Sequence, residues 1–336
     1  MLPSKLKSTM QTLLLADTNR RTTRLGFGCS SIMGATGRRQ SLRLLESAYD
    51  AGIRHFDVAP MYGYGEAESC LGEFLQLHRS DVTVTTKYGI PPARHSRILR
   101  IGRRIAGPVL QHLPALKHRA AKIANAAATH NQPRPAFTAA QAAASLERSL
   151  SALRTSRIDM WLLHEVKASN LEDDGLLQFL EDQVTIGTIG AFGIGSSADK
   201  IPALLAQRPA YCGTLQYQWS VLDEPTPASG SFRIHHQSLT KNFRRLHSAL
   251  LRNDTIRQRW SQAADADLAQ ADRLASLMLK AALVINPASI ILFSSKRPEH
   301  IRANVETAND ASLEAPSQRL HRIVLAEIDQ LFPVKA

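Results

Sequence analysis

Short apolar segments alternate with helix-like segments along the chain, and this alternation constrains the fold more than any other feature. The expected strands cover residues 24–28, 55–58, 82–87, 158–164, 189–195, 214–217, 232–236 and 289–293. Leucine and alanine at helical spacing predict helices over residues 38–51, 66–77, 138–153, 174–185, 199–207, 264–283 and 317–331, with another that begins at Pro298. Strand–helix repeats of this kind build parallel sheets, and eight of them predict an α/β fold, a single-domain (β/α)8 TIM barrel.

A doubly wound open sheet is the alternative fold for the same alternation. Its usual marker is a Gly-x-Gly-x-x-Gly turn between a strand and a helix. Gly26-Phe27-Gly28 begins such a run, but Ser31 stands at the third glycine position and no helical spacing starts there. The barrel is therefore the preferred prediction.

The barrel is predicted to cover residues 23–310, between an N-terminal arm (1–22) and a C-terminal helix (311–336) packed on it. The arm is expected to be loosely held, and its apolar patch, Leu13 to Ala16, is too short for a secretory signal. No apolar run in the sequence approaches a membrane span. The three cysteines are far apart and fit no metal spacing, which favours a reduced, cytoplasmic protein without a metal. We expect a monomer or a weak homo-oligomer.

The net charge of +12 raises the possibility of nucleic-acid binding. Residues 91–137, however, hold nine lysines and arginines and no acids, so the rest of the chain carries only +3. This basic helical insertion after the third strand has few aromatic residues and no recognition motif, and we expect no nucleic-acid partner. A lid, a membrane-surface patch and a partner contact are all open interpretations. We prefer a cationic lid that favours anionic carbonyl substrates; a partly disordered excursion is the alternative.

Four polar residues close or follow the second, third and fourth strands: Asp57, Tyr62, Lys87 and His164. In a barrel these positions meet at one rim. Reduction of a carbonyl by hydride requires a proton donor as the alkoxide forms, and a phenol can fill that role. A neighbouring ammonium would lower the pKa of the phenol, an aspartate would hold the ammonium, and an imidazole could polarise the carbonyl oxygen.

Residues 54–73 resemble the signature of the aldo-keto reductases, with Asp57, Tyr62, Gly63, Gly65 and Gly72 among the matching positions. Trp161-Leu162-Leu163-His164 is similar to that family's fourth-strand motif. The resemblance covers residues 24–310, interrupted by the insertion. It implies that Tyr62 is the general acid/base, tuned by Lys87, with Asp57 as the partner of the lysine and His164 as the group that binds the substrate oxygen. Tyr64 could stand in for Tyr62, although the step of five residues from Asp57 favours Tyr62.

The same resemblance implies a nicotinamide cofactor, with NADP(H) favoured and NAD(H) possible. Gly195 and Ser196 after the fifth strand and Gln216 on the sixth would hold the carboxamide, and His236, or secondarily His235, would stack on the nicotinamide. The implied contacts also include the loop after the first strand (Gly28, Cys29, Ser30), a phosphate site (Ser295, Lys296, Arg297) and an adenine contact (Asn304).

The predicted function is therefore an NAD(P)(H)-dependent oxidoreductase that interconverts a small carbonyl compound, for example a sugar or an anionic sugar derivative, and an alcohol. The alternative is a sensor or partner subunit on the same fold that binds the cofactor with little turnover. Ser196, where many members of the family have asparagine, and His236 are the residues that keep this alternative open.

Overall fold

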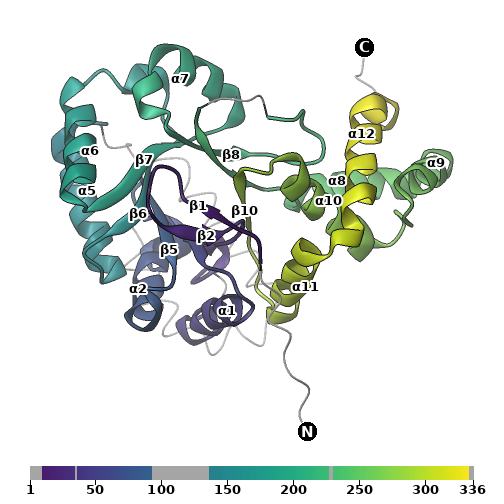
Figure 1. Cartoon of the computed structure of the whole chain (residues 1–336), viewed down its shortest axis with the longest axis horizontal. Helices are drawn as coiled ribbons and strands as arrows, with labels where there is room; N and C mark the ends of the chain where they lie inside the picture. The colour runs from purple at the N-terminus through teal and green to yellow at the C-terminus, as the bar shows by residue number, and fades with distance from the viewer. Residues whose placement is uncertain (1–9, 35, 93–135, 227–229, 333–336) are drawn as a thin grey trace, which may run out of the picture.

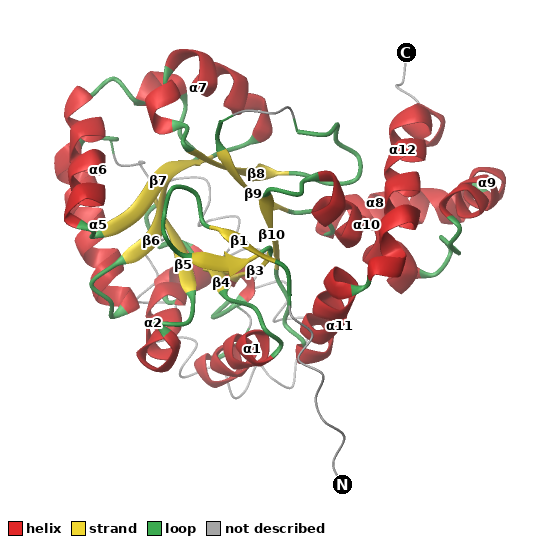
Figure 2. Cartoon of the chain, viewed as in Figure 1, coloured by secondary structure: helices red, strands yellow, loops and turns green. Residues whose placement is uncertain are grey.

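The computed structural model describes residues 10–34, 36–92, 136–226 and 230–332. Eight parallel strands form a closed barrel, which excludes the doubly wound alternative and confirms the predicted fold (Figure 2). In barrel order they are β3 (Leu25–Gly28), β4 (His55–Asp57), β5 (Thr83–Tyr88), β6 (Ile158–His164), β7 (Ile189–Gly195), β8 (Thr214–Gln218), β9 (Phe232–His236) and β10 (Ser289–Phe293), and β10 pairs with β3 to close the ring.

Helices surround the barrel (Figure 1). They are α1 (Arg38–Asp50), α2 (Ala67–His78), α5 (Ala139–Leu153), α6 (Asp174–Ile186), α7 (Ile201–Gln207), α8 (Thr240–Arg252), α9 (Asp254–Ala264), α10 (Ala271–Ile285), α11 (Pro298–Asn309) and α12 (Glu314–Leu331). Local sequence signals explain where two of these helices begin. The Thr138 hydroxyl accepts a hydrogen bond from the Gln141 N–H and so caps α5, and Pro298 occupies the first turn of α11.

The helix predicted near residues 264–283 is α10, but it begins later than predicted and ends at Ile285. α9 ends at Ala264, and α10 begins only at Ala271. Asp265 between them adopts a left-handed conformation with φ of 54°, which breaks the helical path. α8, which the sequence did not predict, packs with α9, α10 and α12 around a second apolar cluster that includes Leu246, Trp260 and Leu277. Figure 1 shows this group on the side of the barrel away from α5 and α6.

The N-terminal segment is not a loosely held arm over its described part. β1 (Thr12–Leu14) and β2 (Arg21–Thr23) form an antiparallel hairpin that lies across one end of the barrel (Figures 1 and 2). Leu15 is 0% exposed and belongs to the same apolar cluster as Met160 and Ile290. The Leu15 side chain therefore packs inside one end of the barrel and holds the hairpin against it, because its burial removes apolar surface from water.

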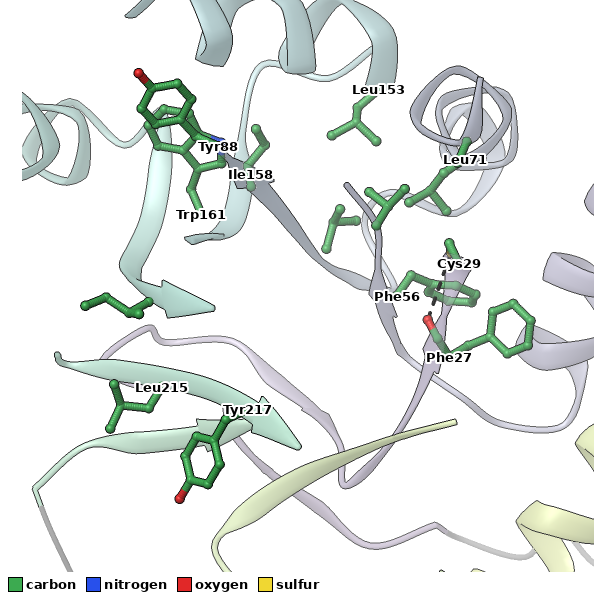
Figure 3. Packing of buried hydrophobic residues seen from close by; sticks show 14 of the residues in the cluster. Phe27, Cys29, Phe56, Leu71, Tyr88, Leu153, Ile158, Trp161, Leu215 and Tyr217 are labelled. Carbon is green, nitrogen blue, oxygen red and sulfur yellow. Dashed lines mark hydrogen bonds between the residues drawn. The ribbon is translucent and has the colours of Figure 1, made fainter. Parts of the chain in front are cut away.

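The main core lies between the outer face of the barrel and the surrounding helices (Figure 3). Phe27, Phe56 and Trp161 project outward from the strands into it, since successive side chains on a strand alternate between the two faces. Gly72 lets α2 approach α5 closely: a Cβ at this position would lie 2.3 Å from the carbonyl oxygen of Ala152. The alternate, inward-facing positions remain available for polar groups.

Nearly all of the basic insertion predicted at residues 91–137 lies outside the described residues. This covers all nine of its lysines and arginines, from Arg94 to Arg134. Among the residues that the structure describes, no helix has the length and apolar character needed to cross a membrane.

Candidate active site

The site lies at the carboxyl ends of the barrel strands, where inward-facing polar side chains converge. Asp57, Lys87 and His164 end or nearly end β4, β5 and β6, and the registers pair these strands side by side. Gln216 and His236 occupy inward positions on β8 and β9. The alternation of each strand and the closure of the barrel thus bring five distant residues to one place.

A buried carboxylate organises this end of the barrel. The Lys87 ammonium donates to Asp57 Oδ1 at 2.6 Å and to the Val58 carbonyl oxygen at 3.1 Å. The Gln216 amide donates to Asp57 Oδ2 at 2.7 Å, so both carboxylate oxygens are engaged. Burial lowers the pKa of Lys87, but Asp57 and Tyr62 raise that pKa by more, and the net shift is upward. The lysine therefore stays charged at neutral pH.

Tyr62 begins a short 3-10 turn between β4 and α2. Its ring centroid lies 5.3 Å from the Lys87 Nζ and 6.5 Å from the His164 ring, with the two rings perpendicular. Gly63 has a φ of 58°, and a Cβ there would meet the Met33 Cβ at 2.5 Å, so the turn needs glycine directly after the tyrosine. Tyr62 lines the central cavity, whereas Tyr64 does not.

The pKa of Tyr62 corrects one expectation. Burial raises it above the ordinary value of 10, and this effect outweighs the Lys87 ammonium, which lowers it. The lysine therefore limits the rise rather than bringing the pKa of the phenol down. In this state of the site Tyr62 is a neutral phenol with a proton to donate.

A cavity of about 420 Å³ opens onto these groups. It is lined by all four residues predicted to be catalytic and by seven of the predicted cofactor contacts, namely Gly28, Ser30, Gly195, Ser196, Gln216, His236 and Asn304. The cavity lining thus combines residues that are far apart in the sequence, from Gly28 at the end of β3 to Asn304 on α11. A cleft of this size accommodates a small organic ligand.

Four predicted cofactor contacts do not line the cavity. The Cys29 thiol is fully buried beside Phe27 (Figure 3), because it continues the outward-facing positions of β3. Ser295 Oγ accepts from the Arg297 N–H and donates to the Arg297 carbonyl oxygen, both at 3.1 Å. Lys296 and Arg297 are exposed at the start of α11. The Lys296 and Arg297 side chains of this turn thus face solvent, whereas Ser295 is buried.

The side chains of the two histidines of β9 point to opposite faces of the strand. His236 faces the cavity, while His235 points outward and packs against Tyr217 with ring centroids 4.8 Å apart. Burial lowers the pKa of His236 to about 4 and that of His235 to about 3. Both rings are therefore neutral at pH 7.

Sequence reasoning missed several lining residues, chiefly Glu165 and the loop at residues 237–240. Glu165 directly follows a predicted strand end, and that position was an available signal. Ser238 is 3% exposed, and its hydroxyl has no hydrogen-bond partner in the part of the chain that the structure describes. α8 begins two residues later at Thr240 without a side-chain cap from Leu239, and the first turn of a helix has backbone N–H groups without partners inside the helix. This arrangement suits an anionic group of a ligand.

Comparison with known proteins agrees with this geometry. The model of the Aldo/keto reductase family matches residues 24–316. D-threo-aldose 1-dehydrogenase of a Pseudomonas species is 32% identical over 183 residues, 51% of this chain and 49% of the relative. Pyridoxal 4-dehydrogenase of Microbacterium luteolum is 40% identical over 78 residues, 22% of this chain and 23% of the relative. The matches therefore span half or less of these relatives.

Among solved structures, an aldo-keto reductase from Klebsiella pneumoniae in complex with NADPH superposes with a TM-score of 0.59 at 17% identity. The superposition covers 97% of this chain and 96% of that one, and it shows the shared fold. The family model spans most of the chain, and the closed barrel with a cavity at its rim agrees with it. This chain belongs to the aldo/keto reductase family.

Proposed function

We propose that this protein is an NAD(P)(H)-dependent oxidoreductase that interconverts a carbonyl compound and an alcohol, with Tyr62 as general acid/base. One observation carries the proposal: the buried Lys87 ammonium, held by Asp57 at 2.6 Å, lies beside the Tyr62 phenol in a cavity also lined by His164. The names of the relatives, an aldose dehydrogenase and a pyridoxal dehydrogenase, support the same class of reaction.

The residues of the cavity fit a nicotinamide cofactor. Ser238 offers a buried hydroxyl without a partner among the described residues, next to the N-terminus of α8, where a pyrophosphate could be bound. Gln216 and Ser196 would hold the nicotinamide carboxamide, His236 would lie against the ring, and Asn304 would contact the adenine. When bound, the reduced cofactor supplies the hydride for the carbonyl carbon.

Residues of the chain would carry out the proton transfer. Tyr62 Oη donates its proton to the carbonyl oxygen as the C–O bond acquires negative charge, and the product is the alcohol. Lys87 stabilises the phenolate that remains, and Asp57 keeps Lys87 charged and in place. The His164 imidazole orients the carbonyl oxygen towards Tyr62. In the reverse direction the phenolate accepts the alcohol proton.

We favour NADP(H) over NAD(H). Lys296 and Arg297 lie exposed in the turn between β10 and α11, where the two side chains could meet a 2′-phosphate. Asn304 on the same helix lines the cavity, so that turn lies at the end of the site where the adenosine would be bound. The NADPH complex of the Klebsiella protein supports this choice.

The replacement of Tyr62 by phenylalanine tests the proposal. We expect Tyr62→Phe to lower kcat for aldehyde reduction by about 10²–10⁴-fold, the usual contribution of a general acid. NADPH binding, followed by tryptophan fluorescence, should stay within about twofold of the wild type because the hydroxyl is not a predicted cofactor contact.

Tyr64→Phe is the matched control, since Tyr64 lies on the same turn but outside the cavity. It should retain wild-type turnover. If wild type and Tyr62→Phe are equally inactive on a broad panel of carbonyls while NADPH still binds, the sensor or partner-subunit alternative replaces this proposal.

A further inference from the structure

α8 has an exposed side on which every charged residue is basic. The helix packs against the second apolar cluster through Leu246 and Leu250, which leaves its other side open to solvent. The exposed charged residues recur at helical spacing and are Lys241, Arg244, Arg245 and Arg252. Because the helix contains no aspartate or glutamate, this surface, the basic face, carries charge of one sign.

The residues of the basic face have no ion-pair partner in the part of the chain that the structure describes. An exposed arginine of the next helix, Arg259, is paired with Glu327, so pairing is available to surface arginines in this region. Arg245 lies over the Phe332 ring, with its guanidinium carbon 3.9 Å from the ring centroid, and this contact leaves its charge in place. The positive charge of the basic face is therefore not neutralised by ion pairs.

Carboxylates near the other sides of α8 offset only part of this charge. Asn242 and His247 of the helix hydrogen-bond to residues that in turn contact Asp223 and Asp267. Two carboxylates do not balance the four basic side chains, so an excess of positive charge remains on the exposed face.

The basic face begins at the wall of the cavity. Thr240, the first residue of α8, lines the cavity. At a rise of about 1.5 Å per residue, the backbones of Lys241 and Arg244 lie within about 6 Å of it along the helix axis. The Debye length at physiological ionic strength is about 8 Å, so the field of these residues reaches the cavity. The carboxylates that line the cavity, Asp57 and Glu165, each have a lysine partner, which limits their opposing effect.

We propose that the basic face of α8 steers the anionic nicotinamide cofactor into the cavity, so that it accelerates association rather than holding the bound molecule. The phosphate groups of the cofactor carry the negative charge that such a field attracts. A field of one sign at a cleft raises association rate constants about 10–10³-fold, and salt removes the effect because exposed charges are screened. This inference rests on the proposed function and concerns how the same site captures its cofactor.

Stopped-flow binding of NADPH and of NADH, followed by tryptophan fluorescence, tests the inference without turnover. In about 0.01 M salt, where the Debye length is about 30 Å, Lys241→Gln/Arg244→Gln should lower the association rate constant about three- to tenfold. The fall should be larger for NADPH, which has one phosphate more than NADH. The dissociation rate constant should stay within about twofold of the wild type. In about 1 M salt, where the Debye length is about 3 Å, the association rate constants should agree within about twofold.

Arg154→Gln/Arg157→Gln is the matched control. It removes the same charge from exposed positions just before β6, at the end of the barrel opposite the cavity. It should retain the wild-type rate constants, which separates a local field from the net charge of +12. Lys241→Glu/Arg244→Glu should lower the association rate constant further than the glutamine variant in dilute salt and should recover in concentrated salt.

The outcomes separate the two proposals. Equal association rate constants for wild type and Lys241→Gln/Arg244→Gln in dilute salt, or an equal fall in the control variant, overturn this inference and leave the proposed function standing. A loss that persists in concentrated salt, or that appears in the dissociation rate constant, also overturns it, because direct contact or altered folding then explains the loss. A wild type that binds neither NADPH nor NADH overturns the proposed function together with this inference.

Discussion

Asp57 receives hydrogen bonds from Lys87 on β5 and from Gln216 on β8, strands on different sides of the barrel opening. The carboxylate and the ammonium are only 3% and 2% exposed. Charges buried to this degree are tolerated because each satisfies the other, and removal of one partner typically costs about 3–5 kcal/mol. The same pair keeps a positive charge beside Tyr62, which limits the rise that burial causes in the pKa of the phenol.

The pH dependence of the reaction should follow Tyr62. Its pKa lies above 10, so the phenol stays protonated through neutral pH. We expect kcat/KM for carbonyl reduction to be flat from about pH 6 to about 9 and to fall only at higher pH, whereas alcohol oxidation, which needs the phenolate, should rise with pH. The measurement is a pair of pH–rate profiles.

A titration of tyrosinate absorbance in wild type and Tyr62→Phe supplies the control, because the difference isolates this one phenol. A difference curve centred below pH 10 would contradict the assignment of a raised pKa.

At the scale of elements, the β1–β2 hairpin closes the amino-terminal end of the barrel while the site occupies the opposite, carboxyl-terminal end. Leu15 supplies the apolar contact, and polar contacts add to it: the Thr22 and Thr83 hydroxyl oxygens lie 2.7 Å apart, and Arg20 donates to the Val82 carbonyl oxygen at 2.8 Å. The hairpin thus excludes water from the barrel interior, where Leu162 and Ile234 pack with Leu15.

Leu15→Ala should lower the free energy of unfolding by about 2–5 kcal/mol, because it deletes buried methyl groups and leaves a cavity in the barrel. Denaturant unfolding followed by circular dichroism measures the change. The control is Leu14→Ala, at the adjacent position that is 53% exposed, which should change stability by less than about 0.5 kcal/mol. Equal losses of stability from the two substitutions would mean that Leu15 is not packed inside the barrel in solution.

At the scale of the whole molecule, the cavity is lined by parts of the chain that belong to separate apolar cores. Its walls come from barrel strands, from the loop before α8, and from α10 and α11. Leu239, just before α8, packs against the helical cluster around Trp260, while Leu279 of α10 and Phe293 of β10 belong to the main core. A ligand that spans this cavity contacts both clusters and should therefore stabilise the folded chain as one unit.

NADPH should raise the thermal midpoint of unfolding more than NADH at equal concentration. A ligand present at about 100 times its Kd stabilises the native state by about 2.7 kcal/mol, and Lys296 and Arg297 are expected to give NADPH the lower Kd. Thermal unfolding with each cofactor measures the difference, and titration of tryptophan fluorescence gives the two affinities.

The double substitution Lys296→Met and Arg297→Met should abolish the preference without loss of NADH binding. A preference for NADH in the wild type would contradict the role of this turn.

The sequence alone predicted the barrel, because strand and helix periodicity are local patterns. The four residues proposed for catalysis followed from polar residues at predicted strand ends and from the resemblance to the aldo-keto reductases. The sequence could not place the β1–β2 hairpin, since a three-residue strand such as Thr12–Leu14 carries little periodicity and Leu15 is buried only by contacts with distant strands. The sequence predicted both Cys29 and Ser30 as cofactor contacts. In the structure the Cys29 side chain points into the core, whereas Ser30 lines the cavity. The upward shift in the pKa of Tyr62 and the position of Glu165 likewise depend on burial and closure of the barrel, which are properties of the tertiary structure and not of any local segment.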